Sequence, residues 1–279
     1  MGDAIGASPN DALILPETEP GHHSGERYWE IDAVRGIAIL GMLFFHVLAV
    51  LVMFHIIVET ETFLRYYNTY ALGTAIFVII AGIAMVLRHE RMHGRTTKEY
   101  YTTLILRGFF LFLLGMGITL ASWIGDTIFL DGTAFIKFGF LHMLGISMII
   151  AVPLLRFRKW NLIFGLIIMA VGFWIIPEIS SPEWLFPLGI HGEDFLLYTQ
   201  DYFPLFPWAG VLLLGVGLGN VFYPNGIRGF KLTYQPKRVI HFLTKLGNGM
   251  VTLFIYLVHI PVIFVIMWIF GAITGIGYL

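Results

Sequence analysis

The feature that most constrains this chain is a series of long apolar segments separated by short polar ones. A helix that crosses a bilayer needs about 20 mostly apolar residues, and it satisfies its own backbone where no water is present. Seven segments reach or approach this length, at residues 33–57, 70–88, 103–122, 136–155, 160–177, 205–223 and 249–274. We therefore predict an all-α membrane protein, a bundle of about seven transmembrane helices.

The composition excludes several other classes of protein. The chain is 57% hydrophobic and only 13% charged, whereas a soluble domain carries about 25% charged residues. It contains no cysteine, which rules out disulfides, thiolate catalysis and thiolate metal sites. With no cysteine available as a ligand, we predict no metal. A formal net charge of -1 gives no basis for a nucleic-acid partner, and we predict none.

The ends of the apolar region suggest a simple domain organisation. Residues 1–26 are polar and turn-rich, and they lack the basic and apolar regions of a signal peptide. We expect a mobile tail followed by a single transmembrane domain over residues 27–279, with its first span acting as the insertion signal. Residues 178–204 form the longest connection, because Pro182, Pro187 and Pro204 break any helix there.

Charge asymmetry between the loops predicts the orientation. With seven spans and a cytoplasmic N-terminus, only Arg65 and Lys137 of the loop cations fall outside, and most outer loop charges are acidic. The positive-inside rule then favours a cytoplasmic N-terminus and an outer C-terminus in the cell membrane. The basic residues on the cytoplasmic side would be Arg27, Arg88, Arg91, Arg95, Lys98, Arg107, Arg156, Arg158, Lys159, Arg228, Lys231, Lys237, Arg238 and Lys245.

Ionisable residues in the first span are the leading candidates for function. Asp32 and Arg35 are three residues apart, so they share a helix face and can form an ion pair. His46 follows Arg35 by eleven residues, which returns it to the same face about 16 Å deeper in the membrane. Taken singly, Asp32 and Arg35 can be an ion pair at the start of a helix, and His46 can bond to a neighbouring helix. The face that Arg35 and His46 share favours a functional site instead.

A second histidine lies at a similar predicted depth in the last span. His259 falls about ten residues into this segment, and Pro261 frees the carbonyl of Leu257. That carbonyl, or Thr252 or Tyr256, can supply a partner. His55 lies nine residues beyond His46, about half a turn round a continuous helix, so the two cannot line one pocket unless the helix bends.

Two further segments hold polar residues at or near the membrane. The run FGFLHMLGIS contains His142, which as a lone intramembrane histidine is most simply a packing residue, and it follows Lys137, which can snorkel to the outer surface. The run DYFPLFPWAGVLLLGVGLG begins with Asp201 at the outer mouth of the sixth span, and its Gly215 and Gly219 form a small-residue packing face.

Taken together, these segments resemble a known family. The run of Arg27, Asp32, Arg35, Gly36 and His46 resembles the first helix of membrane acyltransferases of the acyltransferase-3 group. The later segments, with LGNGMVTLFIYLVHIPV, look more specifically like the catalytic domain of heparan-α-glucosaminide N-acetyltransferase and its small prokaryotic relatives. The resemblance covers roughly residues 27–268.

The resemblance implies acetyl transfer across a membrane, from cytoplasmic acetyl-CoA to an amine or hydroxyl of a sugar or glycan on the outer side. A buried histidine would be the catalytic group. In the animal member of this family the catalytic histidine lies further along the chain, after the first helix, where this chain has His55. The spacing of the acyltransferase-3 group and the face shared with Arg35 favour His46 instead. The remaining candidates are His259 and Asp32 in catalysis, Arg35, Arg88, Arg107 and His142 on the side of acetyl-CoA, and Asp201, Lys137 and Trp208 for the acceptor.

Two other functions compete with this interpretation. A transporter or channel would use the intramembrane histidines and Asp201 as a proton or substrate path, but it predicts repeats or broken helices in matched halves, and the sequence has neither. A retinal protein needs a buried lysine for its Schiff base, and the last span has none. The acceptor, the acyl chain length and the oligomeric state stay open, a homo-oligomer being one alternative.

Overall fold

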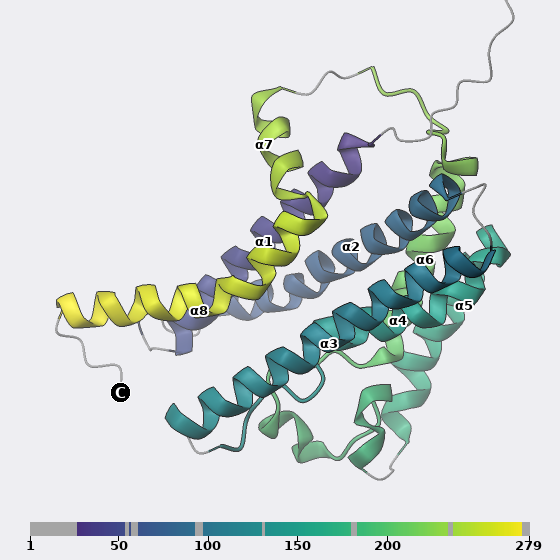
Figure 1. The fold of residues 1–279 in the computed structure, drawn as a ribbon. Coiled ribbons are helices and arrows are strands. Elements are labelled where there is room, and N and C mark those ends of the chain that lie inside the picture. The colour runs from purple at the N-terminus through teal and green to yellow at the C-terminus, as the bar shows by residue number, and fades with distance from the viewer. Residues whose placement is uncertain are drawn as a thin grey trace, which may run out of the picture.

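The protein is described here by a computed structural model, which covers residues 27–53, 56, 61–92, 97–129, 132–179, 183–233 and 237–274. Within these ranges the fold is all-helical, as predicted, and the β pairing is one isolated bridge between Phe135 and Thr199. Figure 1 shows the α-helices, which are α1 (Trp29–Met53), α2 (Glu61–Arg91), α3 (Thr97–Phe129), α4 (Phe140–Leu154), α5 (Asn161–Ala170), α6 (Leu205–Phe222), α7 (Arg238–Leu246) and α8 (Gly249–Thr274).

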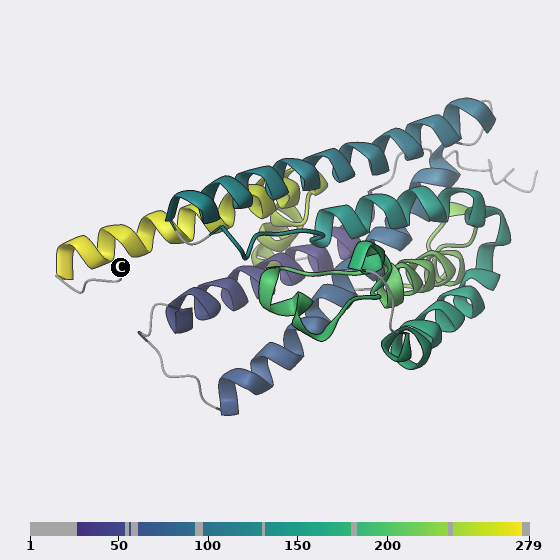
Figure 2. The ribbon, with the colours of Figure 1, turned by 90° about the horizontal axis from the view of Figure 1, so that it is seen from below.

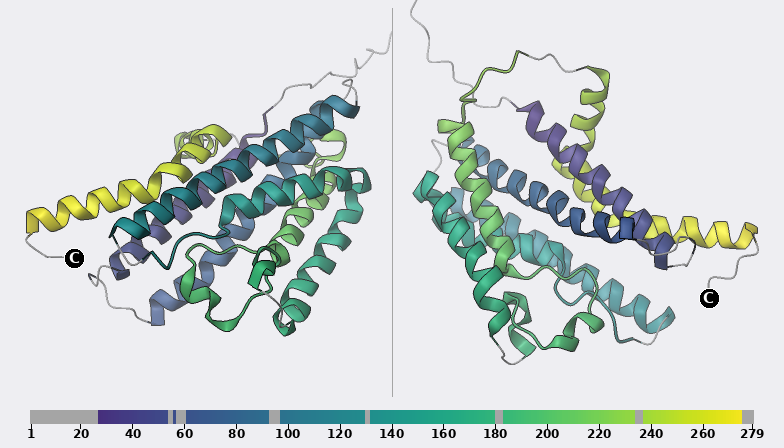
Figure 3. Two further views of the ribbon diagram at one scale, coloured as in Figure 1. Left: turned by 60° about the horizontal axis from the view of Figure 1, so that its bottom comes forward. Right: turned by 180° about the vertical axis from the view of Figure 1, so that it is seen from behind.

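The number of membrane-spanning segments is close to the predicted seven. Six stretches of the described chain are long and apolar enough to cross a membrane. One of them, Phe140–Glu178, contains both α4 and α5, and the chain reverses between these helices near Arg158, whose φ is 46°. α4 packs on α3 and α5 packs on α6 (Figure 3), so the two halves of this stretch occupy different places in the bundle.

Short helical segments lie in the connections before and after α5 and in the connection after α6. The stretch from residue 178 to 204 contains no α-helix in its described part, in agreement with its prolines. The turns are η1 (Leu155–Trp160), η2 (Val171–Ile175), η3 (Ile176–Glu178), η4 (Glu183–Leu188), η5 (Glu193–Tyr198) and η6 (Pro224–Gly226).

The fourth helix begins four residues after the approximate start that we expected for its span. We expected a helix from residue 136, but α4 begins at Phe140. The preceding residues instead run beside the segment that leads into α6. There the backbone N–H of Phe203 donates to the carbonyl of Phe138 at 3.0 Å, and the N–H of Lys137 donates to the hydroxyl of Thr199 at 3.3 Å. These long-range bonds hold residues 137 and 138 outside the helix.

Close backbone contact joins α2 to α6, the two helices at the centre of the bundle. A Cβ on Gly215 would lie 2.3 Å from the carbonyl oxygen of Ile79, and a Cβ on Gly82 would lie 2.3 Å from that of Leu212. Glycine therefore permits the approach, as the small-residue pattern in the sixth span predicted. Around this pair the bundle spreads, with α8 at one edge and α5 at the other (Figures 1 and 2).

Basic loops from different parts of the sequence meet at one end of the bundle. This end, where α1 and α8 begin and α2 ends, is called the basic face below. Arg228, beyond α6, donates two hydrogen bonds of 2.8 Å to Glu30 in the first turn of α1. Arg158 between α4 and α5 pairs with Glu90 at the end of α2, at 3.3 Å. The loops that charge counting assigned to one side therefore share one face.

We predict that Gly215→Ala destabilises the protein and that Gly117→Ala does not. Alanine is intrinsically favoured over glycine in a helix by up to about 1 kcal/mol. At Gly117 a Cβ meets nothing within 4 Å, so this gain is retained. At Gly215 the clash with backbone should outweigh it by about 1–3 kcal/mol. Thermal unfolding of both variants in detergent tests this, and equal unfolding temperatures would contradict it.

Candidate active site

The carboxylate of Asp32, in the first turn of α1, joins two arginines. The Nη1 of Arg35 donates to its Oδ1 at 2.9 Å, and the Nε of Arg27 donates to its Oδ2 at 2.6 Å. The ion pair predicted from the spacing of Asp32 and Arg35 is thus confirmed. Arg35 Nη1 also donates to the carbonyl of Gly247 at 2.8 Å, which ties α1 to the chain just before α8.

Beside this ion pair lies a cavity of about 470 Å³, called the arginine pocket below. Its size is within the range of small-molecule sites. The pocket opens at the basic face, between the starts of α1, α3 and α8 and the end of α2. Its charged lining is Arg27, Arg35, Arg88, Arg91, Arg107 and Asp32. The structure therefore brings together the three arginines predicted to hold the phosphates of a cofactor, and adds two more.

Deeper in the membrane, His46 of α1 and His259 of α8 contact each other. Their ring centroids are 4.7 Å apart, in an edge-to-face arrangement. His259 is 6% exposed, and His46 is partly buried. The prediction that the two imidazoles lie at similar depth is confirmed. Because Arg35 and His46 are both on α1, this helix leads from the arginine pocket to the histidine pair.

Hydrogen bonds fix the same tautomer in both rings. The Nδ1 of His46 lies 2.9 Å from the carbonyl of Met42, and that of His259 lies 2.6 Å from the carbonyl of Tyr256. A carbonyl only accepts, so each Nδ1 donates its hydrogen and each Nε2 carries a lone pair in the neutral ring. The Nε2 of His259 is buried and has no hydrogen-bond partner in the described structure. Such a nitrogen suits a base or a nucleophile.

Asp201 lies near the histidine pair and interacts with His259. It lies just before α6 with a φ of 47°, and its carboxylate accepts hydrogen bonds from the backbone N–H of Phe140 and the hydroxyl of Tyr256. Burial raises the pKa of Asp201, and the bond from Phe140, the nearby His259 and the bond from Tyr256 offset part of this rise. Tyr256 therefore links Asp201 to the histidine pair.

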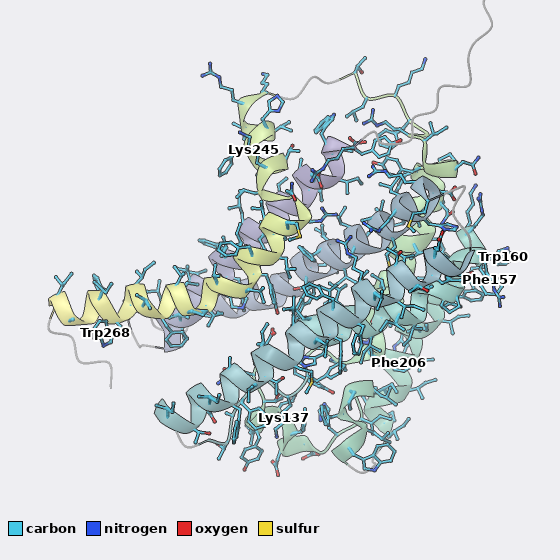
Figure 4. All side chains as sticks on the ribbon, in the orientation of Figure 1. Lys137, Phe157, Trp160, Phe206, Lys245 and Trp268 are labelled. Carbon is cyan, nitrogen blue, oxygen red and sulfur yellow. The ribbon has the colours of Figure 1, made fainter. Side chains whose placement is uncertain are left out.

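The other two predicted acceptor residues lie in the layer around Asp201. The ammonium group of Lys137 lies 5.2 Å from the ring centroid of Phe195, and two more aromatic rings lie within about 6 Å of it. Figure 4 shows Lys137 on the side of the molecule away from Lys245 of α7. Trp208 packs against Phe203, with ring centroids 5.2 Å apart. Both side chains are partly buried among aromatic groups.

His142 is held at the start of α4, apart from the arginine pocket. Its Nδ1 accepts from the backbone N–H of Gly139 at 3.1 Å, and its Nε2 lies 3.4 Å from the hydroxyl of Thr119. The ring sits against Gly115, about 12 Å along α3 from Arg107. This geometry matches the packing role considered for His142, and it gives the residue no contact with the pocket where we expected acetyl-CoA.

Three residues of this region were not assigned to the candidate site from the sequence. Arg27 and Arg91 line the pocket, and Tyr256 connects Asp201 to His259. The spacing of Arg88 and Arg91 at the end of a predicted helix was a usable signal. Tyr256 had been weighed only as a hydrogen-bond partner of His259, because its second contact comes from a distant segment.

The catalytic role of His55 and the absence of a metal stay predictions. His55, the rival catalytic histidine, lies outside the described residues. In the ranges that the structure describes, no group of three or more His, Asp or Glu side chains is arranged to hold a metal ion.

With this geometry in place, comparison with known proteins identifies the family. Residues 27–261 match the family model described as heparan-alpha-glucosaminide N-acetyltransferase, catalytic. The chain belongs to this family. The matched range includes the arginine pocket, the histidine pair and Asp201. Membership of the heparan-alpha-glucosaminide N-acetyltransferase catalytic family, together with the six apolar helices, implies a transferase embedded in a membrane. No curated protein and no solved structure matches the chain.

We predict that Asp201→Asn flattens the dependence of stability on pH. Because the pKa of Asp201 is raised, the folded protein retains this proton to a higher pH than the unfolded chain does. The protonated Asp201 therefore contributes its full stabilisation below the pKa of about 3.9 that an aspartate has in the unfolded chain. This stabilisation is lost as the pH rises through the higher pKa of Asp201 in the folded protein. Unfolding temperatures from about pH 4 to about pH 7 would show the wild type declining more steeply than the variant.

The matched control for this experiment is Glu193→Gln. Glu193 is an exposed carboxylate at the start of η5, on the same connection as Asp201. Its replacement should leave the pH dependence unchanged. An Asp201→Asn curve that is parallel to the wild-type curve would contradict the raised pKa of this carboxyl group.

Proposed function

We propose that the protein is an acetyltransferase that takes an acetyl group from acetyl-CoA in the arginine pocket. The histidine pair then mediates its transfer to an amine or hydroxyl of a sugar or glycan near Asp201. The observation that carries this proposal is the position of His46 and His259, between a pocket with five arginines and the partly buried carboxylate of Asp201. The groups proposed to bind acetyl-CoA, to carry out the transfer and to bind the acceptor thus follow one another through the bundle.

The donor side suits coenzyme A because this molecule carries several phosphates. Guanidinium groups bind phosphate oxygens with paired, charge-assisted hydrogen bonds. Asp32 neutralises part of the positive charge of Arg27 and Arg35, and Arg88, Arg91 and Arg107 add three further cations. With the phosphates at the pocket, the long pantetheine arm would carry the thioester along α1 toward His46, about 16 Å beyond Arg35.

The orientation predicted from the loop charges is consistent with acetyl-CoA binding in the arginine pocket. A cytoplasmic N-terminus puts the basic face, and with it the arginine pocket, on the side of the membrane where acetyl-CoA is made. Asp201 then lies toward the outer side, where its carboxylate would accept a hydrogen bond from the acceptor. Lys137 and Trp208 are proposed to contact the acceptor from the same layer.

The neutral histidines allow two chemical routes. In the first, an Nε2 takes a proton from the acceptor as the acceptor's nitrogen or oxygen attacks the acetyl carbonyl, and coenzyme A leaves as a thiolate. In the second, Nε2 attacks the carbonyl itself, the coenzyme A thiolate leaves, and an acetyl-imidazolium forms. The acceptor's nitrogen or oxygen then attacks this acetyl group, Nε2 leaves as the neutral imidazole, and the acceptor's proton passes to that nitrogen. Both routes use the lone pair that the Nδ1 hydrogen bonds direct to Nε2.

We predict that His46→Ala and His259→Ala each reduce acetyl transfer by at least about 10²-fold, the contribution of a positioned base. The assay follows label from [14C]acetyl-CoA to glucosamine with purified protein. His241→Ala, which removes an exposed histidine of α7, should retain activity. Size-exclusion profiles would verify that each variant remains folded.

The same series discriminates between the alternatives. If His46→Ala stays fully active while His55→Ala does not, the assignment of the catalytic histidine is wrong. A wild-type protein that neither binds nor consumes acetyl-CoA would overturn the transferase proposal. Proton flux in proteoliposomes without acetyl-CoA would instead favour a transporter or channel, which could use the same chain of His46, His259 and Asp201.

For the donor site, we predict that Arg107→Gln raises the KM for acetyl-CoA by about tenfold or more and leaves kcat nearly unchanged. A hydrogen bond to a charged group contributes about 1.5–3 kcal/mol, and Arg107 would bind the donor without contacting the reacting carbonyl. Arg156→Gln is the control, because Arg156 lies on the basic face but outside the pocket. A KM that is equal in both variants would contradict the assignment of the pocket.

A further inference from the structure

The chain between α6 and α8 has an unusual distribution of charge. Asp201 is the last acidic residue of the protein, so every charged side chain beyond it is basic. Arg228 is neutralised by Glu30. Lys231, Lys237, Arg238 and Lys245 are exposed, and with the residues that the structure describes none of the four forms an ion pair. A net positive charge is thus concentrated around α7 on the basic face.

α7 is strongly amphipathic. At about 100° per residue, Val239, Phe242 and Leu246 fall on one side, and Arg238 and Lys245 fall on the other with His241. Val239 is 69% exposed and Phe242 is 56% exposed, although both are apolar. A helix with this division of side chains is typical of those that lie in the interface of a membrane.

The inner side of α7 is seated firmly on α1. A Cβ on Gly36 would lie 2.1 Å from the carbonyl oxygen of Leu243, and one on Gly247 would lie 1.6 Å from that of Asp32. In Figures 1 and 3 α7 lies across the first turns of α1. α7 is therefore already packed against α1, and Val239 and Phe242 remain exposed in this packed position.

The position of α7 along the membrane normal follows from its neighbours. α8, which is apolar enough to span the membrane, begins two residues after Gly247. Its Met250 is 77% exposed and Phe254 is 64% exposed, so the outward apolar surface of α8 starts where that of α7 ends. Elsewhere on the basic face, Trp160 is 64% exposed (Figure 4), as expected of an aromatic side chain at the membrane boundary.

We propose that α7 lies in the headgroup layer and binds anionic phospholipids. Val239 and Phe242 enter the outer part of the acyl-chain region. Arg238 and Lys245 contact the phosphate groups of lipids whose negative charge complements this part of the protein. Since Gly247 holds Arg35 at the rim of the arginine pocket, the bound lipid also supports the segment that positions this arginine.

The absence of cysteine allows a direct test of depth, because a single introduced cysteine can be labelled alone. The full chain carrying Phe242→Cys or His241→Cys would be labelled with bimane and reconstituted in phosphatidylcholine vesicles with phosphatidylglycerol. Nitroxides on the lipid chains should quench the label at position 242 strongly, and aqueous iodide should quench the label at position 241. Stronger iodide quenching at position 242 would overturn the proposal, as would quenching there by neither agent, which indicates a protein contact.

Lipid selectivity is tested separately with spin-labelled phosphatidylglycerol and phosphatidylcholine. Each basic residue near an anionic surface adds about fivefold in affinity, so Arg238→Gln with Lys245→Gln should remove most of the preference of the wild type for phosphatidylglycerol. The matched control is Arg156→Gln with Lys159→Gln, which removes the same charge from η1 on the same face. An equal loss in both double variants, or no loss in the α7 variant, would overturn the assignment to α7.

Discussion

The buried carboxylate of Asp32 is the interaction on which the functional end of the bundle depends. Asp32 is 5% exposed and accepts hydrogen bonds from two arginines. Removing one member of such a buried pair typically costs about 3–5 kcal/mol, because an uncompensated charge remains. Through Arg35 and the carbonyl of Gly247, the same network fixes where α7 ends and α8 begins. The hydrogen bonds of Asp32 and Arg35 thus support both the wall of the arginine pocket and the approach of α8 to α1.

Much of this arrangement was predictable because it is local or set by the bilayer. Spanning helices satisfy their own backbone, so apolar length alone located the helices. The pairing of Asp32 with Arg35 follows from a spacing of three residues on one helix. His46 lies on α1 at a depth set by helical rise. The sequence predicted a similar depth for His46 and His259, and the structure adds that their rings are in contact.

The remaining features could not be derived from the sequence, because they depend on which helices become neighbours. Asp201 meets Tyr256 only when the segment before α6 passes the middle of α8. The late start of α4 reflects backbone bonds from residues more than 60 positions away. His142 was assigned to the donor side from its motif, but its hydrogen bond to Gly139 holds it at the start of α4.

The arrangement of polar groups also explains why a transferase of this kind benefits from a membrane. A thioester bound at the basic face and an acceptor near Asp201 would be separated by the thickness of the bundle, and the histidine pair is the polar contact between α1 and α8 within it. Apolar surroundings exclude water, which would otherwise hydrolyse an activated acetyl group. The Nδ1 hydrogen bonds to backbone carbonyls hold both rings without using a second ionisable side chain. In the proposed mechanism the reactive nitrogens would be held in a fixed orientation away from water, with the arginine pocket and Asp201 at the two ends of the site.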